Sequence, residues 1–470
     1  MRLKVRNFGP IKKADVDFGQ LTIFIGKNNT GKSYLAQLHY TLLDSSRRTI
    51  REAFAHYPFS YGIEDEDLTI YESFQTAREQ LGDLARRIKT EKLTNSSIMN
   101  DIIEFTLKDM AQRLQSNLRL SLESSFGVRM GNLINISART AKIGWDFLEH
   151  VLATVELTKR GSINVQLHLS RSERMRIEEF IKNSKFMGFL IKARKRRLNY
   201  LARLYFDIRR SLFRTKDAKL SWPPRAYYIP AGRGGLLESY ETVVRGLVSL
   251  SPRAPVRGLS MPPLPGMASQ FYSVLLRLQG KKGPMGAKLN ETFEEILQGE
   301  VHLRKDRGQP KARVVYRFRQ GKDSDSTDVI HAASMIKELA PIYLIVRELI
   351  KPRDFLIIEE PESHLHPGAQ MRFAGIIATL VQNGVRVLIT THSDLLLREI
   401  GHLVAESLIR KGAQQLKPSN VSVSWLRETS FGSISERIAL PKRGIIEDVP
   451  TFDEIVKELY EKEKKLEQVL

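Results

Sequence analysis

Residues 21 to 33 read LTIFIGKNNTGKS, and this stretch decides the fold expected for the chain. Leu21–Ile25 is a short apolar run typical of a buried strand, and the eight residues after it match the pattern G-x-x-x-x-G-K-[ST] at every position. Glycines let the backbone turn so that successive amides face an anion. The helix expected from Ser33 to Leu43 points its positive N-terminus at the same anion. The stretch therefore predicts a loop that binds the phosphates of a nucleoside triphosphate.

The whole loop is expected to contact ATP, and its last two residues have separate tasks. Lys32 is expected to reach the β- and γ-phosphates, and the Ser33 hydroxyl is expected to ligate Mg²⁺. A chance match in an ordinary glycine-containing turn is the alternative, but the strand before the loop and the helix after it are the context that the motif requires. The predicted nucleotide-binding residues of the loop are Gly26, Lys27, Asn28, Asn29, Thr30, Gly31, Lys32 and Ser33.

A second apolar strand, Phe355–Ile358, ends in the glutamates Glu359 and Glu360. A carboxylate at the carboxyl end of a buried parallel strand lies beside a phosphate loop. Glu359 is expected to hold Mg²⁺ through water, and Glu360 is expected to polarise the attacking water as the catalytic residue. The alternative is a pair of surface carboxylates at a strand end.

Another buried strand, residues 385–390, ends in Thr391-His392-Ser393. A histidine at that position can hydrogen-bond the γ-phosphate and report its loss, so His392 is the second catalytic candidate. A single histidine in a loop is more often an ordinary polar residue. His364 and His366 between the two strands also suggest a metal site, but no third ligand is evident.

The combination resembles a known family. LIIEEPESHLHP at 356–367 followed by VLITTHS at 387–393 is similar to the ATPase heads of SMC, RecF and OLD (overcoming lysogenization defect) proteins, although most relatives have Asp where this chain has Glu359. The resemblance covers residues 1–44 and 223–449. It implies an α/β P-loop NTPase head of the ABC type, with a mixed sheet, an antiparallel lobe and an inserted, mainly helical arm. By the same resemblance residues 364–367 match the D-loop and His392 matches the switch histidine.

Heads of this type dimerise around ATP, and a serine-led signature helix of one head caps the ATP of the other. The segment HAASMIKEL at 331–339 is similar to the A-S-S-G-x-K-E-L of OLD-like proteins, with Ala333 for a serine and Met335 for the glycine. Ser334 is the candidate that contacts the partner's ATP and is expected to be the N-cap of this helix. An ordinary capped core helix is the alternative. Arg233, after the strand at 227–229, is a candidate sensor of nucleotide or partner chain, or a solvated turn arginine.

The ATPase pattern is absent between residues 45 and 222. Residues 72–93, 99–125 and 186–213 have the apolar spacing of helices, and INVQLHL at 163–169 alternates like a strand. The expected domains are therefore 1–44 and 223–449 for the head, 45–222 for the arm, and 450–470 for a C-terminal amphipathic helix.

Charge favours an anionic partner. The 470 residues contain 74 Lys and Arg against 53 Asp and Glu, a net charge of +21. Residues 185–219 are strongly basic with interleaved Tyr200, Tyr205 and Phe206, which suggests either a nucleic-acid surface, a solvated face or a docking face for an acidic protein. Cysteine is absent, so no disulfide or thiolate metal site is expected.

The sequence thus predicts an ATPase with ATP and Mg²⁺ as cofactors that forms an ATP-dependent homodimer or higher oligomer. Its expected role is a switch on DNA or on a separate nuclease or effector subunit, in antiviral defence or genome maintenance. No signal peptide or bilayer-spanning run is evident, so a cytoplasmic location is expected. The rivals are a full OLD nuclease, for which no D-x-D pair follows His392, a transporter ATPase, for which no LSGGQ-like segment exists, and a weakly hydrolysing interaction scaffold.

Overall fold

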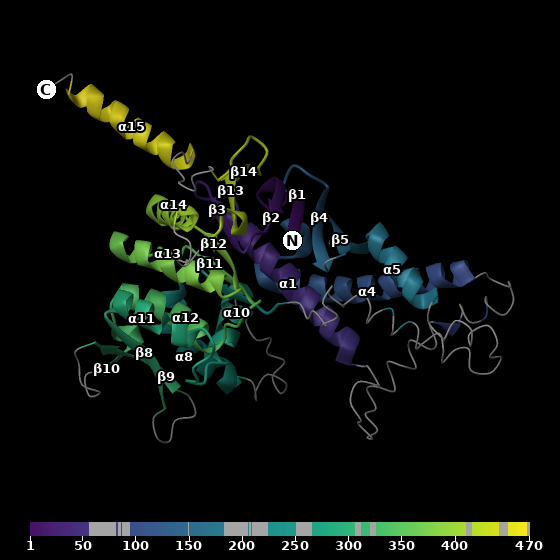
Figure 1. The fold of residues 1–470 in the computed structure, drawn as a ribbon, viewed down its shortest axis with the longest axis horizontal. Helices are drawn as coiled ribbons and strands as arrows, with labels where there is room; N and C mark the ends of the chain where they lie inside the picture. The colour runs from purple at the N-terminus through teal and green to yellow at the C-terminus, as the bar shows by residue number, and fades with distance from the viewer. Residues whose placement is uncertain are drawn as a thin grey trace. The chain divides into compact units, whose positions relative to one another are not determined.

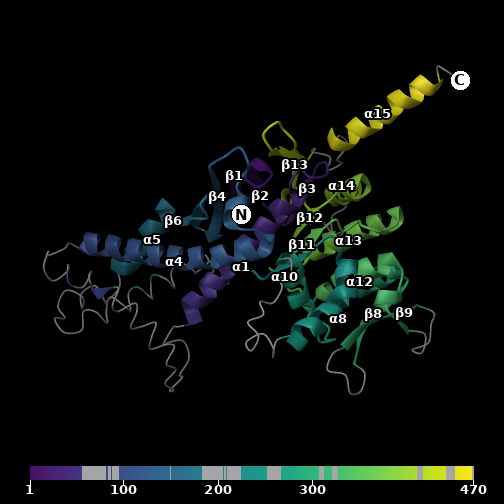
Figure 2. The ribbon, with the colours of Figure 1, turned by 180° about the vertical axis from the view of Figure 1, so that it is seen from behind.

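The computed structural model describes residues 1–55, 81, 82, 86, 95–148, 150–182, 205, 208, 224–250, 266–305, 312–319, 326–409, 416–440 and 450–467. Its contacts divide the chain into two units. The first unit comprises Met1–Phe8, Thr41–Leu122 and Arg129–Pro224, and the second comprises Gly9–Tyr40, Glu123–Val128 and Arg225–Leu470. Figures 1 and 2 show the ribbon from opposite sides.

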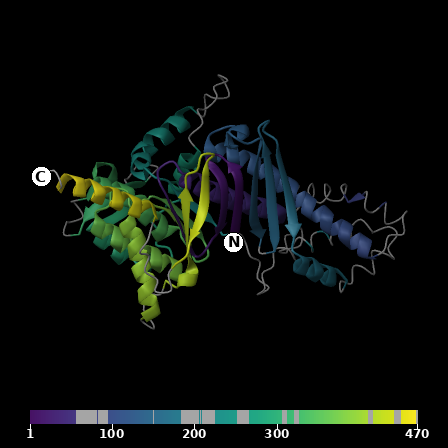
Figure 3. The ribbon, with the colours of Figure 1, turned by 90° about the horizontal axis from the view of Figure 1, so that it is seen from above.

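The second unit is built on a mixed sheet with the strand order β2-β14-β13-β3-β12-β11-β7. The five strands from β13 to β7 are mutually parallel, β14 runs antiparallel to β13, and β2 pairs parallel with β14. Figure 3 shows β13 and β14 (yellow) beside the purple strands. The strands are β2 (Ile11–Asp17), β3 (Leu21–Ile25), β7 (Ala226–Ile229), β11 (Phe355–Glu359), β12 (Arg386–Thr390), β13 (Val421–Arg427) and β14 (Ser433–Ile438).

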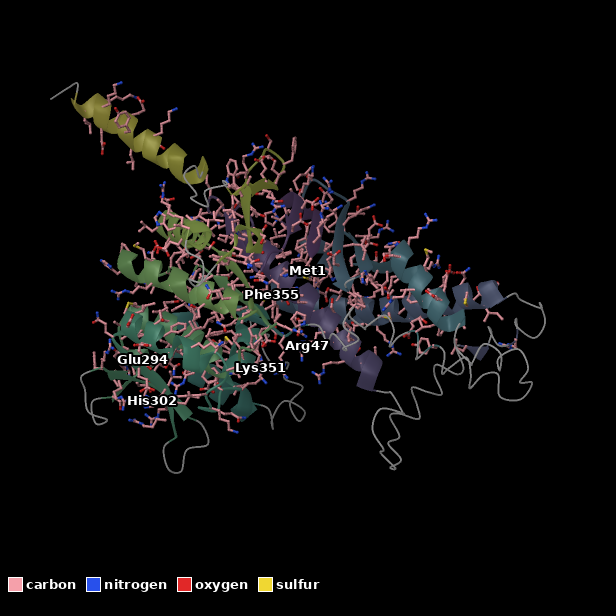
Figure 4. All side chains as sticks on the ribbon, viewed as in Figure 1. Met1, Arg47, Glu294, His302, Lys351 and Phe355 are labelled. Carbon is pink, nitrogen blue, oxygen red and sulfur yellow. The ribbon has the colours of Figure 1, made fainter. Side chains whose placement is uncertain are left out.

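The central strands β3 and β11 are buried along their whole length, as the continuous apolar runs in the sequence predicted. Phe355, at the start of β11, is buried inside the second unit (Figure 4). The strand register aligns the carboxyl ends, because Glu359 pairs with Thr390 and Thr390 pairs with Phe24. The residues that follow β3, β11 and β12 therefore emerge at one edge of the sheet.

Helices cover this sheet, and α11, α12 and α13 lie side by side (Figures 1 and 2). The helix after the phosphate loop begins one residue earlier and runs farther than the expected Ser33–Leu43. Helix α1 (Lys32–Ala55) begins in the second unit, and its residues from Thr41 onward belong to the first unit. The other helices of the second unit are α8 (Arg233–Leu250), α10 (Gly266–Leu275), α11 (Gly286–Leu297), α12 (Ser334–Glu348), α13 (Pro367–Gln382), α14 (Asp394–Ile409) and α15 (Pro450–Glu467), with single 3₁₀ turns at Val329–His331 and Pro418–Asn420.

A small antiparallel sheet of order β10-β9-β8 belongs to the same unit. Its strands are β8 (Gly299–Lys305), β9 (Ala312–Phe318) and β10 (Ser326–Asp328). Helix α11, which carries Glu294, contacts β8, which carries His302 (Figure 4). The antiparallel lobe expected of the head is therefore present.

The first unit contains a run of antiparallel strands in the order β6-β5-β4-β1. Burial alternates along these strands, so each presents one apolar face. The long helix α4 contacts the sheet, since the Val165 backbone N–H donates to Gln115 Oε1 at 3.3 Å. The elements are β1 (Arg2–Phe8), α4 (Asn95–Phe126), a 3₁₀ turn (Met130–Leu133), β4 (Thr140–Leu148), β5 (Val151–Thr158), β6 (Ile163–Leu169) and α5 (Arg171–Lys182).

The expected arm, 45–222, and this unit cover much of the same chain but differ in their bounds. The first unit also includes Met1–Phe8, residues 41–44 and Pro224, whereas Glu123–Val128 belong to the second. The strand at 163–169 and the helix near 99–125 are confirmed, and β4 and β5 are two further strands that were not expected. The helices expected at 72–93 and 186–213 lie, apart from a few positions, outside the described residues.

Candidate nucleotide site

The phosphate loop joins the buried end of β3 to α1, and its backbone requires the glycines at both ends. Gly26 has a φ of +146°, and a Cβ there would lie 2.4 Å from the Leu426 carbonyl oxygen. Gly31 has a φ of +88°. Asn29, between them, also adopts a left-handed φ of 63°. The loop therefore packs its base against the end of β13, while Lys27, Asn28 and Asn29 are exposed to solvent.

Lys32 is 5% exposed, and its ammonium group lies over the carbonyls of the loop. Its Nζ donates to the Gly26 carbonyl at 3.0 Å and to the Lys27 carbonyl at 2.8 Å. The Thr30 hydroxyl donates to the same Lys27 carbonyl at 2.9 Å. Burial lowers the pKa of Lys32 to about 8, although Glu360, Glu362 and Glu359 act in the opposite direction. A cation thus lies at the loop, within the field of three carboxylates.

Glu359, the last residue of β11, is buried and has one oxygen without a partner. Its Oε2 accepts a hydrogen bond from the Ala231 backbone N–H at 3.1 Å. Its Oε1 has no hydrogen-bond partner among the described residues. An unsatisfied buried carboxylate oxygen is costly unless a cation or water binds it. This arrangement fits the expected role of Glu359 as an Mg²⁺-binding residue.

Glu360 follows in an unusual backbone conformation, with a φ of 42°. Its N–H donates to the Thr390 carbonyl at 2.9 Å, which ties it to the end of β12. Its Oε1 lies 3.7 Å from His392 Nε2, and its Oε2 accepts from the Ser363 hydroxyl at 3.3 Å. Left-handed conformations of residues other than glycine are strained and are often found at functional sites. The structure therefore brings the two expected catalytic residues, Glu360 and His392, together.

His392 is positioned by Glu362, a residue with no role predicted from the sequence. Glu362 Oε1 accepts from the Thr391 hydroxyl at 2.8 Å and from the His392 backbone N–H at 2.7 Å. Burial raises the pKa of Glu362, and these hydrogen bonds oppose the shift. The sequence feature that could have indicated Glu362 is its place as the third glutamate of EEPE, two residues after Glu360.

Burial lowers the pKa of His392, and Lys32 lowers it further, while Glu360 acts in the opposite direction. The imidazole is therefore mainly neutral at pH 7 and carries one N–H and one acceptor nitrogen. Ser393 follows His392 and caps the start of α14. Its Oγ accepts a hydrogen bond from the Leu396 N–H at 3.0 Å.

The expected N-cap role of Ser334 is wrong. The N-cap of α12 is Ala333, which makes no side-chain cap hydrogen bond, and Ser334 is the first helical residue. Ser334 is exposed, and so is Ala333. Ala333 has the extended backbone of a cap (φ −60°, ψ 151°), so the helix starts one residue earlier than the serine pattern suggested. The serine hydroxyl lies at the exposed beginning of the helix.

Arg233 is 0% exposed, so it is not a solvated turn arginine, and its guanidinium binds groups of this chain. It donates to the backbone carbonyls of Glu338, Glu359 and Glu360. Its expected role as a sensor of nucleotide or partner chain stays a prediction. A single arginine after a Gly-containing turn gives no sign in the sequence that it is buried.

The metal-site reading of His364 and His366 gains no support. His366 is the N-cap of α13, and its Nδ1 accepts from the Gly368 N–H at 3.3 Å. Within the described ranges, no group of three His, Asp or Glu side chains is arranged to hold a metal ion. The described helices include none that is long and apolar enough to cross a membrane.

The basic stretch 185–219 lies outside the described residues except for Tyr205 and Ile208. Tyr205 is buried, and its hydroxyl donates to Asp109 Oδ2 at 2.6 Å. This tyrosine is therefore not one of the aromatic side chains available for stacking on a nucleic acid.

Two family models match parts of the chain. A model described as "AAA ATPase domain" matches residues 1–134, and one described as "AAA domain, putative AbiEii toxin, Type IV TA system" matches residues 297–398. The first range contains the phosphate loop, and the second contains Ser334, the three glutamates and His392. Both halves of the site are thus similar to AAA-type ATPase sequence. A comparison with curated proteins found no match.

Solved SMC heads are similar over most of the chain. A Smc head bound to the C-winged helix domain of ScpA has 13% identity and a TM-score of 0.41, covering 94% of this chain and 98% of that chain. A Smc head from Pyrococcus furiosus, bound to the C-terminal domain of ScpA, has 12% identity and a TM-score of 0.40, covering 98% of each chain. The SMC head domain from Thermotoga maritima has 10% identity and a TM-score of 0.37, covering 93% and 98%.

Proposed function

We propose that this chain binds and hydrolyses ATP. The observation that carries the proposal is the meeting of Lys32, Glu359, Glu360 and His392 at one edge of a parallel sheet, within 3.7 Å for the Glu360–His392 pair. Strand–loop–helix phosphate sites beside a strand-end carboxylate are the arrangement of P-loop NTPases. The two AAA-type matches support the same activity.

The residues of the site have separate roles in nucleotide binding and hydrolysis. The backbone amides of residues 26–33 and the Lys32 ammonium bind the phosphates. Ser33 and Glu359 would hold Mg²⁺, which supplies positive charge to the phosphate oxygens. Glu360 accepts a hydrogen bond from water and orients it toward the γ-phosphate. Neutral His392 donates its N–H toward the same phosphate.

The assembly is part of the proposal. Two chains dimerise head to tail around two ATP molecules, and the exposed start of α12 at Ser334 faces the partner's ATP. The dimer, or a higher homo-oligomer, acts as a switch on a separate nuclease or effector subunit or on DNA, and the net charge of +21 supports an anionic partner. The resemblance in EEPESHLHP and THS supports the OLD branch and a role in antiviral defence or genome maintenance, and we place this role in the cytoplasm.

A weakly hydrolysing interaction scaffold is the second candidate. It is favoured by Ala333 and Met335, which replace the serine and glycine of the OLD-like signature. The two candidates differ in the turnover that they predict, since a scaffold would bind ATP and change its assembly with little hydrolysis.

Steady-state ATPase and nucleotide-binding assays test the activity. Glu360→Gln removes the carboxylate that orients water but preserves its shape, so turnover should fall by about 100-fold or more while ATP binding is retained. Lys32→Ala should lose ATP binding itself, because it removes the phosphate-facing cation. Glu291→Gln, on an exposed position of α11, is the matched control and should behave like the wild type. Unchanged turnover in Glu360→Gln would contradict the proposed catalytic residue.

A further inference from the structure

Arg233 occupies a position where three parts of the second unit meet. It is the first residue of α8 and is completely buried between the end of β11 and α12. Its Nε donates to the Glu338 carbonyl of α12 at 2.9 Å and lies 3.3 Å from Glu338 Oε2. Burial lowers the pKa of Arg233, and the negative charge of Glu338 is the largest effect that raises it. A guanidinium remains charged under these conditions, so a buried cation joins the two helices.

The other end of the guanidinium binds the catalytic turn. Its Nη1 donates to the Glu359 carbonyl at 2.9 Å, and both Nη atoms lie 3.4 Å from the Glu360 carbonyl. These two carbonyls belong to the peptide groups on either side of the Glu360 Cα. Arg233 therefore restrains both backbone dihedrals of Glu360, the residue with the left-handed φ of 42°. Such a conformation persists only where the surrounding contacts hold it.

The α12 side of this contact is close to the exposed start of that helix. Glu338 lies four residues after Ser334, so the two residues are neighbours along one face of α12. Glu338 Oε1 also accepts from the Gly234 N–H at 3.1 Å, which fixes the carboxylate against α8. A displacement of the first turn of α12 would therefore move Glu338 and, through it, Arg233.

We propose that Arg233 is a positioning residue that couples the exposed first turn of α12 to the carboxylates of Glu359 and Glu360. The inference rests on the proposed ATPase function and adds a route by which an event at Ser334 reaches the hydrolytic residues. Arg233 touches the backbone of the two glutamates and acts through them. Its planar guanidinium is required because it presents donors in two directions at fixed angles.

Arg233→Lys is the sharpest test, since lysine keeps the charge but has a single donor atom. The expected result is a fall in kcat on the order of 10- to 100-fold with a KM for ATP within about threefold of the wild-type value, because displaced catalytic groups impair chemistry while the phosphate loop is intact. A loss of stability alone would lower the melting temperature and leave kcat per folded molecule unchanged. Arg233→Lys with wild-type kcat would overturn the proposal.

Glu338→Gln provides a second measurement if Arg233→Lys fails to fold. The amide keeps the shape and an acceptor for the Gly234 N–H but loses the ion pair, so kcat should fall while KM changes little. Glu348→Gln is the matched control on the same helix, because Glu348 also accepts two backbone hydrogen bonds, from Gln279 at 2.8 Å and Gly280 at 2.9 Å. It should keep the wild-type kcat. Equal kcat in both glutamine variants would overturn the coupling.

The failure of this inference is distinguishable from failure of the ATPase proposal. If Glu360→Gln retains turnover, the proposed hydrolytic site is wrong. If Glu360→Gln is inactive while Arg233→Lys and Glu338→Gln keep full turnover, the site is supported and only the coupling is overturned.

Discussion

At the scale of single residues, Glu362 holds the segment that carries His392. One of its oxygens accepts two hydrogen bonds, from the Thr391 hydroxyl and the His392 N–H. Both donors are partly buried, so removal of the Glu362 carboxylate would leave them without this hydrogen-bond acceptor. The position of His392 therefore depends on a residue that has no direct part in the proposed chemistry.

Glu362→Ala should destabilise the fold by about 1–3 kcal/mol for the unsatisfied buried donors. It should also lower ATPase activity, because His392 loses its backbone support. Chemical denaturation and steady-state kinetics measure the two effects. Glu362→Gln keeps an acceptor oxygen and should be milder in both assays. Wild-type stability and activity in Glu362→Ala would show that the segment is held by other contacts.

The sequence predicted Lys32, Glu359, Glu360 and His392 because each one follows a strand whose apolar run is visible in the chain. It did not predict the role of Arg233, since that role depends on a partner 105 residues away and on burial that local sequence does not reveal. Ser334 was misplaced by one residue for a related reason. Serine is a common N-cap, but the extended backbone lies at Ala333.

At the scale of elements, α8 and α12 approach each other at Gly234. A Cβ on Gly234 would lie 2.7 Å from Glu338 Oε1 and 3.3 Å from the Lys337 Cβ, whereas a Cβ on Gly235 would meet nothing within 4 Å. The two adjacent glycines therefore differ in the space that is available for a side chain. Gly234 allows the close helix contact, and Gly235 faces open space.

Gly234→Ala should lower stability by about 1–3 kcal/mol, because a methyl group must displace Glu338. Gly235→Ala is the matched control and should be neutral or stabilising by up to about 1 kcal/mol, since alanine favours a helix. Thermal or chemical unfolding of both variants provides the comparison. Equal stability of the two variants would mean that the helices separate here at little cost.

The element-scale expectations succeeded where apolar runs were continuous or helical spacing was long, as in β3, β11 and α4. They failed for β4 and β5, although their alternating burial also alternates in the sequence from Thr140 to Thr158. The alternation is typical of half-buried strands, whereas the family resemblance implies a mainly helical arm. The pairing of β4 with β1 joins residues more than a hundred positions apart, and no local pattern predicts it.

At the scale of the whole molecule, the proposed head-to-tail dimer would use the exposed start of α12 and the exposed part of the phosphate loop. ATP with Mg²⁺ should convert Glu360→Gln from single chains to dimers, because this variant retains ATP without hydrolysing it. Light scattering with and without ATP measures the mass.

Adding Ser334→Arg to Glu360→Gln should abolish this change, because a long charged side chain would clash with the partner's nucleotide. The double variant should still bind ATP, which separates a blocked interface from a damaged site. The same mass in every nucleotide state would contradict ATP-driven dimerisation.

The position of Lys32 has a consequence for the protons exchanged on binding. With a pKa of about 8, roughly half of this side chain is uncharged at pH 8 before nucleotide arrives. Anionic phosphates favour the charged form and raise the pKa, so binding takes up hydrogen ions from the medium. The uptake should be small near pH 6, where the amine is already charged, and should grow toward pH 8. Nucleotide affinity should accordingly weaken as the solution becomes alkaline, and the heat of binding should vary with the ionisation enthalpy of the buffer.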